Sequence, residues 1–249
     1  MLTEDRYSSI LEIVNRQGSA TLTELCTMLD TSESTIRRDL IYLDEKGALI
    51  KVRGGARSNT DSTFAMTERN IDEKEKLFAE EKEAIAKFAA SLIEDGDFIY
   101  MDAGTTTEKM IPYIPKVDAT FVTNGFIHAK KLALKGFKVF VPAGEVKGTT
   151  EALVGAACVL SLSEYNFTKS FLGVNGISFN AGLTTPDKRE AEVKKAAVKH
   201  SREVFFLADH SKFDRITAIT FAPLSEGKII TDKLENKKYQ TEASVKEVL

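Results

Sequence analysis

The sequence predicts an α/β protein in two parts: a small helical domain with a β-hairpin, then a larger domain built on a mostly parallel sheet. Apolar residues recur at helical spacing through the first fifty residues and then alternate over a short stretch. Further along, apolar strand-like runs alternate with helical stretches, which is typical of a parallel sheet covered by helices. The 249 residues have room for two modest domains, which we place at 3–58 and 75–249, with a linker over 59–74.

The composition excludes several classes of protein. Hydrophobic residues make up 43% of the chain and charged residues 29%, so global disorder is excluded. Cys26 and Cys158 are far apart, and the 3 histidines form no HExxH motif, so we expect no disulfide scaffold, metal site or cofactor. The polar start is no signal peptide, and no apolar run has the length of a membrane span. We therefore expect a reduced, soluble, cytoplasmic protein without membrane contact.

Three helices are expected before residue 50. The first runs over Arg6–Arg16, and the third from about Glu33 to Lys46, where Gly47 caps it. Thr21 begins the second helix, and Glu24 three residues later completes a capping-box pattern. Helix, short polar turn and helix is the arrangement that places a second helix in a DNA major groove.

The third helix carries short polar and arginine side chains on its outer face. If Ile36, Leu40 and Leu43 face the core, five other side chains face outward or lie beside the apolar face: Ser34, Thr35, Arg37, Arg38 and Tyr42. Arginine can bind guanine edges or hold phosphates.

The segment after the third helix predicts a small β-hairpin wing. Residues 49–55 alternate, and Lys51 and Arg53 would flank the DNA backbone there. Residues 1–33 carry a net charge of −4 and residues 34–57 a net charge of +3, so this stretch is locally basic. A small helical interaction module is the alternative, but the helices, turn and basic wing together favour DNA binding.

The second part alternates strands and helices. Residues 57–63 are polar and indicate a linker, and a charged helix follows over residues 72–93. Buried-strand runs are expected at Phe98–Met101, Thr120–Thr123, Lys138–Val141, Ser170–Val174, Val204–Ala208 and Lys228–Thr231. Helices are expected at Thr107–Tyr113, His128–Lys135, Gly155–Leu162 and Glu190–His200. Ligands of such folds bind at the carboxyl ends of the strands.

A threonine-rich loop follows the first of these strands and opens a helix. Its residues are Asp102, Ala103, Gly104, Thr105, Thr106 and Thr107. Glycine allows a ligand to approach the backbone closely, threonine supplies hydroxyls and the helix start supplies N–H groups. A phosphate is therefore the expected ligand. The pattern is neither GxGxxG nor a Walker loop, which disfavours nucleotide binding.

Polar or glycine-rich clusters also follow the other strands. They include Asn124, Gly144, residues 173–176 and residues 209–213, which contain Lys212. Any one cluster is as well explained by a turn, but together they favour a polar pocket. Asp187 and Glu190 can accept hydrogen bonds from sugar hydroxyls, and Lys212 can form an ionic contact with a phosphate. Lys194 lies one helical turn after Glu190, so an ion pair between them is the alternative to a ligand contact.

These motifs resemble the DeoR family of bacterial repressors over essentially the whole chain. The amino-terminal match rests on residues 35–40, Leu43 and residues 53–56, which resemble the family's winged helix-turn-helix. The carboxyl-terminal match rests on residues 102–107, Thr123 with Asn124, Asp187 with Glu190 and Lys194, and residues 209–213, which resemble its sensor domain. That sensor fold resembles sugar-phosphate isomerases of the ribose-phosphate type.

The resemblance implies a repressor that a phosphorylated sugar releases from operator DNA. Residues 183–187 and 208–213 look most like the fructose-operon branch, whose effector is fructose 1-phosphate. Residues 150–155 also fit the lactose-operon branch, whose effector is tagatose 6-phosphate. Because helix-turn-helix proteins read symmetric half-sites, we expect a homo-oligomer, a dimer or a tetramer. The alternatives are a sugar-phosphate isomerase-like enzyme with an accessory DNA-binding module, or a structural interaction protein.

Overall fold

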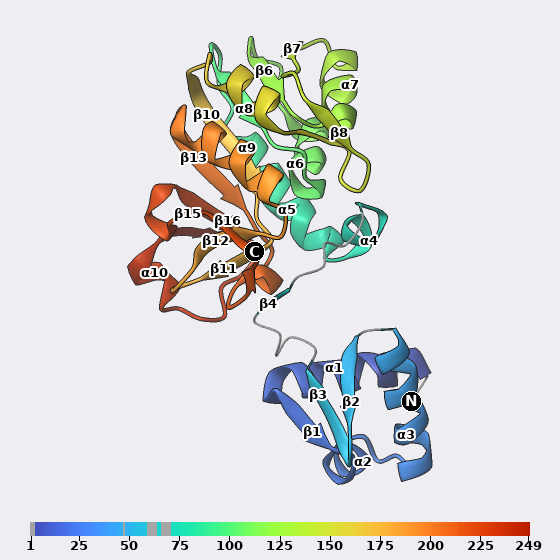
Figure 1. Cartoon of the computed structure of the whole chain (residues 1–249). Coiled ribbons are helices and arrows are strands. Elements are labelled where there is room, and N and C mark those ends of the chain that lie inside the picture. The colour runs from blue at the N-terminus through green and yellow to red at the C-terminus, as the bar shows by residue number, and fades with distance from the viewer. Residues whose placement is uncertain (1–2, 47, 59–63, 66–70) are drawn as a thin grey trace. The chain divides into compact units, whose positions relative to one another are not determined.

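The computed structural model describes residues 3–46, 48–58, 64–65 and 71–249. The chain divides into two compact units, residues 1–64 and 65–249 (Figure 1). None of the helices in the described residues combines the length and the apolar character that crossing a bilayer requires.

The first unit packs three helices against a small antiparallel sheet (Figure 1). Its helices are α1 (Thr3–Gln17), α2 (Leu22–Leu29) and α3 (Glu33–Glu45). Its strands, in the order β1-β3-β2, are β1 (Ser19–Thr21), β3 (Gly55–Ser58) and β2 (Leu49–Val52). The core is formed by side chains that are almost fully buried: Ile10, Val14, Leu25, Ile36, Leu40 and Leu49.

Local contacts explain why the helices start and turn where they do. The N–H of Glu24 donates to Thr21 Oγ1 (3.2 Å), and the N–H of Thr21 donates back to a Glu24 carboxylate oxygen (2.7 Å), which is the expected capping box. Asp30 adopts left-handed backbone angles (φ 46°) and turns the chain toward α3. Arg6 reaches across to the buried Asp39 (2.6 Å) and ties α1 to α3.

The three expected helices and the hairpin are confirmed, with two differences. β1 was not expected, because a strand of three residues carries almost no periodic signal. Arg57 and Ser58 were expected in the polar linker stretch, whereas both belong to β3 and Ser58 is buried. Gly47 and most of the expected linker, residues 59–63 and 66–70, lie outside the described residues.

In the described part of the second unit, seven strands form one parallel sheet. The order across it is β17-β16-β13-β10-β5-β6-β7. The strands are β5 (Phe98–Met101), β6 (Thr120–Thr123), β7 (Lys138–Phe140), β10 (Phe167–Gly173), β13 (Ser201–Leu207), β16 (Lys228–Thr231) and β17 (Ser244–Glu247). The six expected strands are confirmed, and β17 is an addition.

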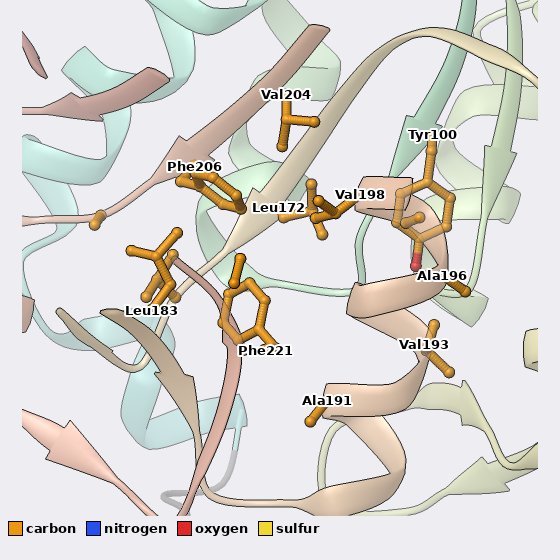
Figure 2. Packing of buried hydrophobic residues seen from close by; sticks show 14 of the residues in the cluster. Tyr100, Leu172, Leu183, Ala191, Val193, Ala196, Val198, Val204, Phe206 and Phe221 are labelled. Carbon is orange, nitrogen blue, oxygen red and sulfur yellow. The ribbon is translucent and has the colours of Figure 1, made fainter. Parts of the chain in front are cut away.

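Helices cover both faces of this sheet. The helices described in the second unit are α4 (Ile71–Lys76), α5 (Ala79–Ala90), α6 (Thr105–Met110), α7 (Phe126–Leu134), α8 (Ala156–Leu162), α9 (Lys188–Lys199) and α10 (Tyr239–Glu242), with single 3-10 turns at Ile111–Tyr113, His210–Lys212 and Leu224–Glu226. Alternate strand residues enter different cores: Tyr100 packs with α8 and α9, whereas Ile99 and Met101 pack with α5 and α6. Figure 2 shows Leu172 and Phe206 of the sheet and Val198 of α9, which belong to one buried cluster.

The single charged helix expected over residues 72–93 is wrong in its continuity. The chain forms α4 and then α5, because Phe78 between them takes left-handed backbone angles (φ 54°) that a continuous helix does not allow. This break turns the start of α5 relative to α4.

Smaller strands complete the second unit. β11 (Gly176–Ser178), β12 (Gly182–Thr185) and β15 (Ile219–Ala222) form an antiparallel sheet, and Leu183 and Phe221 from it join the core in Figure 2. β8 (Glu145–Lys147) and β9 (Ala152–Val154) form a hairpin. The remaining short strand of this unit is β14 (Ile216–Thr217), and β4 (Phe64–Ala65) lies at the division between the two units in the sequence.

Candidate functional site

The candidate DNA-reading residues of the first unit lie on α3 and on the hairpin. Arg37, Arg38 and Tyr42 are exposed on α3, opposite the buried face made by Ile36 and Leu40. Arg37 is held by an exposed ion pair with Glu33 (3.3 Å), one turn earlier. Such a pair contributes little and leaves the guanidinium available to another anion.

The remaining candidates in this unit flank that face. Ser34 is exposed and Thr35 half-buried at the start of α3, and each hydroxyl lies within hydrogen-bond distance of Ser32 Oγ. Lys51 and Arg53 are exposed on the hairpin. Tyr42 stacks on Tyr7 of α1 (ring centroids 4.8 Å apart), so part of this side chain supports the packing of α3.

The second unit contains a cavity of about 120 Å³ at the carboxyl ends of β5, β10 and β13. Eight of the twelve candidate ligand residues line it: Asp102, Ala103, Gly104, Thr105, Thr106, Glu190, Lys194 and Lys212. The other four candidates, Thr107, Asn124, Gly144 and Asp187, lie outside its wall. The position at the strand ends is the one that the alternating pattern predicts.

A buried ion pair lies in the cavity wall. Lys194 Nζ donates to Asp102 Oδ2 and to the carbonyl of Gly173 (2.9 Å), and the N–H of Gly173 donates to the same carboxylate oxygen (3.1 Å). The alternative expectation, an ion pair between Lys194 and Glu190, is wrong. Glu190 instead accepts hydrogen bonds from Thr150 Oγ1 (2.7 Å) and Lys147 Nζ (3.1 Å) on the β8–β9 hairpin.

Thr107 and Asn124 lie outside the cavity wall and form hydrogen bonds with the threonine loop. Asn124 Oδ1 accepts hydrogen bonds from the N–H of Ala103 (3.0 Å) and the hydroxyl of Tyr100 (2.9 Å). Thr107 Oγ1 accepts from the N–H of Gly104 (3.0 Å) and donates to the carbonyl of Asp102 (2.6 Å). Both residues therefore fix the loop's shape, and two loop amides are already satisfied within the protein.

His128 supports the same loop. Its Nε2 lies 3.1 Å from the carbonyl of Gly104, which can only accept, so Nε2 carries the proton. Burial lowers the pKa of His128 and outweighs the opposing effect of the nearby acidic groups. The imidazole is therefore neutral and acts as a donor to the loop.

Asp187 and Gly144 have structural places at the start of α9 and beside β9. Asp187 caps α9 by accepting from the N–H groups of Arg189 (2.7 Å) and Glu190 (3.2 Å). Burial alone would raise the pKa of Asp187, but hydrogen bonds, first of all from Lys147, outweigh it and lower the pKa. A side chain at Gly144 would lie 2.8 Å from the carbonyl of Val154, so glycine is required there.

Three cationic residues of the cavity wall were missed by the sequence analysis: Lys74, Lys82 and Arg215. Together with Lys194 and Lys212 they set five cations against the three acidic side chains Asp102, Glu190 and Asp209. The wall therefore carries an excess of positive charge, which suits an anionic ligand. Within the described residues no cluster of metal-ligating side chains is found.

Comparison with known families decides what kind of protein this is. Residues 6–62 match the DeoR-like helix-turn-helix domain, and residues 77–233 match the DeoR C terminal sensor domain. The chain belongs to the DeoR family. The expected family is thus confirmed, as is the expected fold of a helix-turn-helix followed by an α/β sensor domain. This DeoR-family chain is a DNA-binding transcriptional regulator, which sets aside the isomerase-like enzyme.

Relatives of the DeoR-family chain match it along nearly their whole length. The HTH-type transcriptional regulator FruR of Bacillus subtilis, which is uncharacterized, is 40% identical and covers 100% of this chain and 99% of its own. A lactose phosphotransferase system repressor of Staphylococcus epidermidis is 38% identical, with 98% of each chain covered. The repressor GlcR of Bacillus subtilis is 34% identical, covering 96% of this chain and 92% of its own.

Among solved structures, ribose 5-phosphate isomerase A from Methanocaldococcus jannaschii is similar to part of the chain. The match covers 53% of each chain with a TM-score of 0.40 and 17% identity. Similarity at this level does not indicate function.

Proposed function

We propose that this DeoR-family regulator represses a sugar-utilisation operon, that of fructose, and that fructose 1-phosphate releases it from operator DNA. We infer a phosphorylated ligand from the cavity at the strand ends, which has an excess of cations and the hydroxyls of Thr105 and Thr106 in its wall. The resemblance of residues 183–187 and 208–213 to the fructose-operon branch supports the choice of sugar. The similar lactose phosphotransferase system repressor supports control of a sugar operon more generally.

The residues of the cavity wall suit the two ends of a sugar phosphate. Lysine ammonium groups and threonine hydroxyls donate to phosphate oxygens. Carboxylates such as that of Glu190 accept from sugar hydroxyls, and a bound sugar would compete there with Thr150 and Lys147. The ligand would thus change contacts between α9 and the β8–β9 hairpin.

Release of DNA follows from linkage between the two sites. The effector weakens operator binding only by as much as it prefers the arrangement that does not bind DNA. In the proposed dimer or tetramer, that arrangement changes the spacing of the paired reading helices, because a symmetric operator fixes the distance between its half-sites. A tenfold loss of operator affinity corresponds to about 1.4 kcal/mol of coupling.

A binding assay tests the proposal directly. The full chain selects its operator from random duplexes, and fluorescence anisotropy then follows release as fructose 1-phosphate is added. We expect release by fructose 1-phosphate at lower concentrations than by fructose 6-phosphate, tagatose 6-phosphate or glucose 6-phosphate, and none by fructose. Release by tagatose 6-phosphate at the lowest concentration would assign the other sugar, and release by no phosphorylated sugar would refute the effector class.

A further inference from the structure

Lys82 is a buried cation in the wall of the cavity. It lies near the start of α5 with 4% of its surface exposed. Its Nζ donates to the carbonyl of Lys74 on α4. In the described part of the chain, no carboxylate forms an ion pair or a hydrogen bond with it. A buried ammonium that lacks a counter-ion is strongly disfavoured, so an anion from outside the protein would stabilise it.

The surroundings of Lys82 are predominantly positive. Burial is the largest cause that lowers the pKa of Lys82 to about 8, and the charges of Lys212, Lys109 and Lys74 contribute to the same shift. Asp209 is the one acidic group that opposes them, and its carboxylate is already bound by Lys212 Nζ (2.9 Å) and by the hydroxyl of Ser211. Positive charge is therefore concentrated on this side of the cavity.

The threonine loop offers fewer donors to a phosphate than its sequence suggests. The N–H of Ala103 donates to Asn124, and that of Gly104 to Thr107. α6 is only six residues long, so its start is a weak source of positive potential. The hydroxyls of Thr105 and Thr106 remain for contacts with a ligand. The cationic side chains of the cavity wall are not part of this loop.

We propose that the phosphate group of the effector binds between Lys82 and Lys212, and that its sugar hydroxyls extend toward Asp102 and Glu190. This assignment rests on the proposed function and gives the ligand a direction in the cavity. The phosphate bridges the start of α5 and the 3-10 turn at 210–212, and the phenyl ring of Phe78 lies beneath Lys212 (Nζ to ring centroid 5.7 Å). Since Lys82 also holds the carbonyl of Lys74, phosphate binding would fix α4, the first helix after the DNA-binding unit.

Proton uptake on binding is a consequence of this geometry. Near pH 8, Lys82 of the unliganded protein is only partly protonated, and a bound dianion favours the ammonium form. We expect the protein to take up protons when phosphate binds near pH 8. Phosphate affinity should fall as the pH rises further, because the unliganded cation is then lost.

Calorimetry with inorganic phosphate tests the assignment on the full chain without sugar or DNA. We expect Lys82→Met and Lys212→Met each to weaken phosphate binding by roughly tenfold or more. The matched control is Lys109→Met, which removes a nearby charge outside the cavity wall and should change affinity by less than about threefold. Circular dichroism establishes that each variant is folded.

A measurement on the unmodified protein keeps the test decisive if Lys82→Met does not fold. Titrations at pH 8 in buffers of different ionisation enthalpy count the protons taken up. Absence of saturable phosphate binding, absence of proton uptake, or equal affinity of a folded Lys82→Met variant would overturn the assignment. Loss of phosphate binding in Thr105→Ala with Thr106→Ala alone would place the phosphate at the loop instead. Failure of fructose 1-phosphate to release DNA would refute the proposed effector but leave this result standing.

Discussion

Lys194 of α9 donates a hydrogen bond to Asp102, a residue 92 positions earlier that directly follows β5. Both side chains are almost fully buried. Gly173 at the end of β10 contacts both of them through its N–H and its carbonyl. Two strands and a helix are therefore joined at the cavity wall by one charged pair.

Removing one partner of this pair should be strongly destabilising. Asp102→Asn leaves the Lys194 ammonium buried without its counter-charge, and we expect a loss of about 3–5 kcal/mol in the free energy of unfolding. The double variant with Lys194→Met should lose less than Asp102→Asn alone, because no uncompensated charge remains. Urea unfolding followed by circular dichroism measures both. Glu192→Gln on the exposed part of α9 is the control and should stay within about 0.5 kcal/mol. A double variant less stable than Asp102→Asn would contradict this account.

The exposed arginines of α3 should carry operator recognition. We expect Arg37→Ala and Arg38→Ala each to weaken operator binding by about 1–3 kcal/mol if they contact bases, since each removes a charged donor set from the groove. Affinity for DNA should also fall steeply with salt, because phosphate contacts release counterions. A gel-shift titration measures both effects, with Arg202→Ala on the exposed surface of β13 as the control. Unchanged affinity in both α3 variants would show that another helix reads the operator.

The threonine loop should act on release and leave DNA binding alone. In the Thr105→Ala, Thr106→Ala double variant, the operator dissociation constant should stay within about twofold, since both residues lie in the sensor unit. The effector concentration needed for release should rise by roughly tenfold or more, because two hydroxyl donors to the ligand are lost. Anisotropy with the selected operator gives both numbers. Thr241→Ala, at an exposed residue of α10, serves as the control, and a normal release curve for the double variant would remove the loop from the site.

The parts of the fold that the sequence predicts are those with a strong local signal. β5 is a continuous apolar run, and α3 places Ile36, Leu40 and Leu43 at helical spacing. β17, with the sequence Ser-Val-Lys-Glu, has one apolar residue and lies at the edge of the sheet, so its assignment depends on pairing with β16. The break between α4 and α5 depends on the backbone of one residue, Phe78, which no periodicity reveals.

In the candidate site, too, the sequence predicts the residues that have a strong local signal. The threonine loop could be found because it directly follows a strand and opens a helix. Lys82 could not, since it stands between Glu81 and Glu83 in a charged stretch that is typical of a solvated helix face. Its burial results from the packing of α5 near the turn that carries Lys212, far along the chain. Asn124 shows the opposite case, a polar residue after a strand whose side-chain hydrogen bonds go to Tyr100 of β5, to the loop and to β9.

His210 and Asp232 form a second pair, outside the cavity wall, whose stabilising effect should depend on pH. His210 Nδ1 lies 2.6 Å from Asp232 Oδ2, and the N–H of His210 donates to Oδ1 (2.7 Å). The hydrogen bond that His210 donates to Asp232 raises the pKa of His210 above its ordinary value of 6.5. Burial acts to raise the pKa of Asp232, but the bonds from His210 outweigh it and lower the pKa.

The signs of the two shifts fix the pH window. The contribution of His210 to stability is fully present below pH 6.5 and is lost as the pH rises through its raised pKa. The contribution of Asp232 is present above its ordinary pKa of 3.8 and is lost as the pH falls through its lowered pKa. We therefore expect His210→Gln to reduce the free energy of unfolding most between about pH 4 and 6.5 and progressively less above that. Urea unfolding at several pH values measures the difference, with Lys199→Gln, at the exposed end of α9, as the control. A difference between the unmodified protein and His210→Gln that stays constant from pH 5 to pH 9 would show that the pKa of His210 is the same in the folded and the unfolded protein, and would contradict the raised pKa.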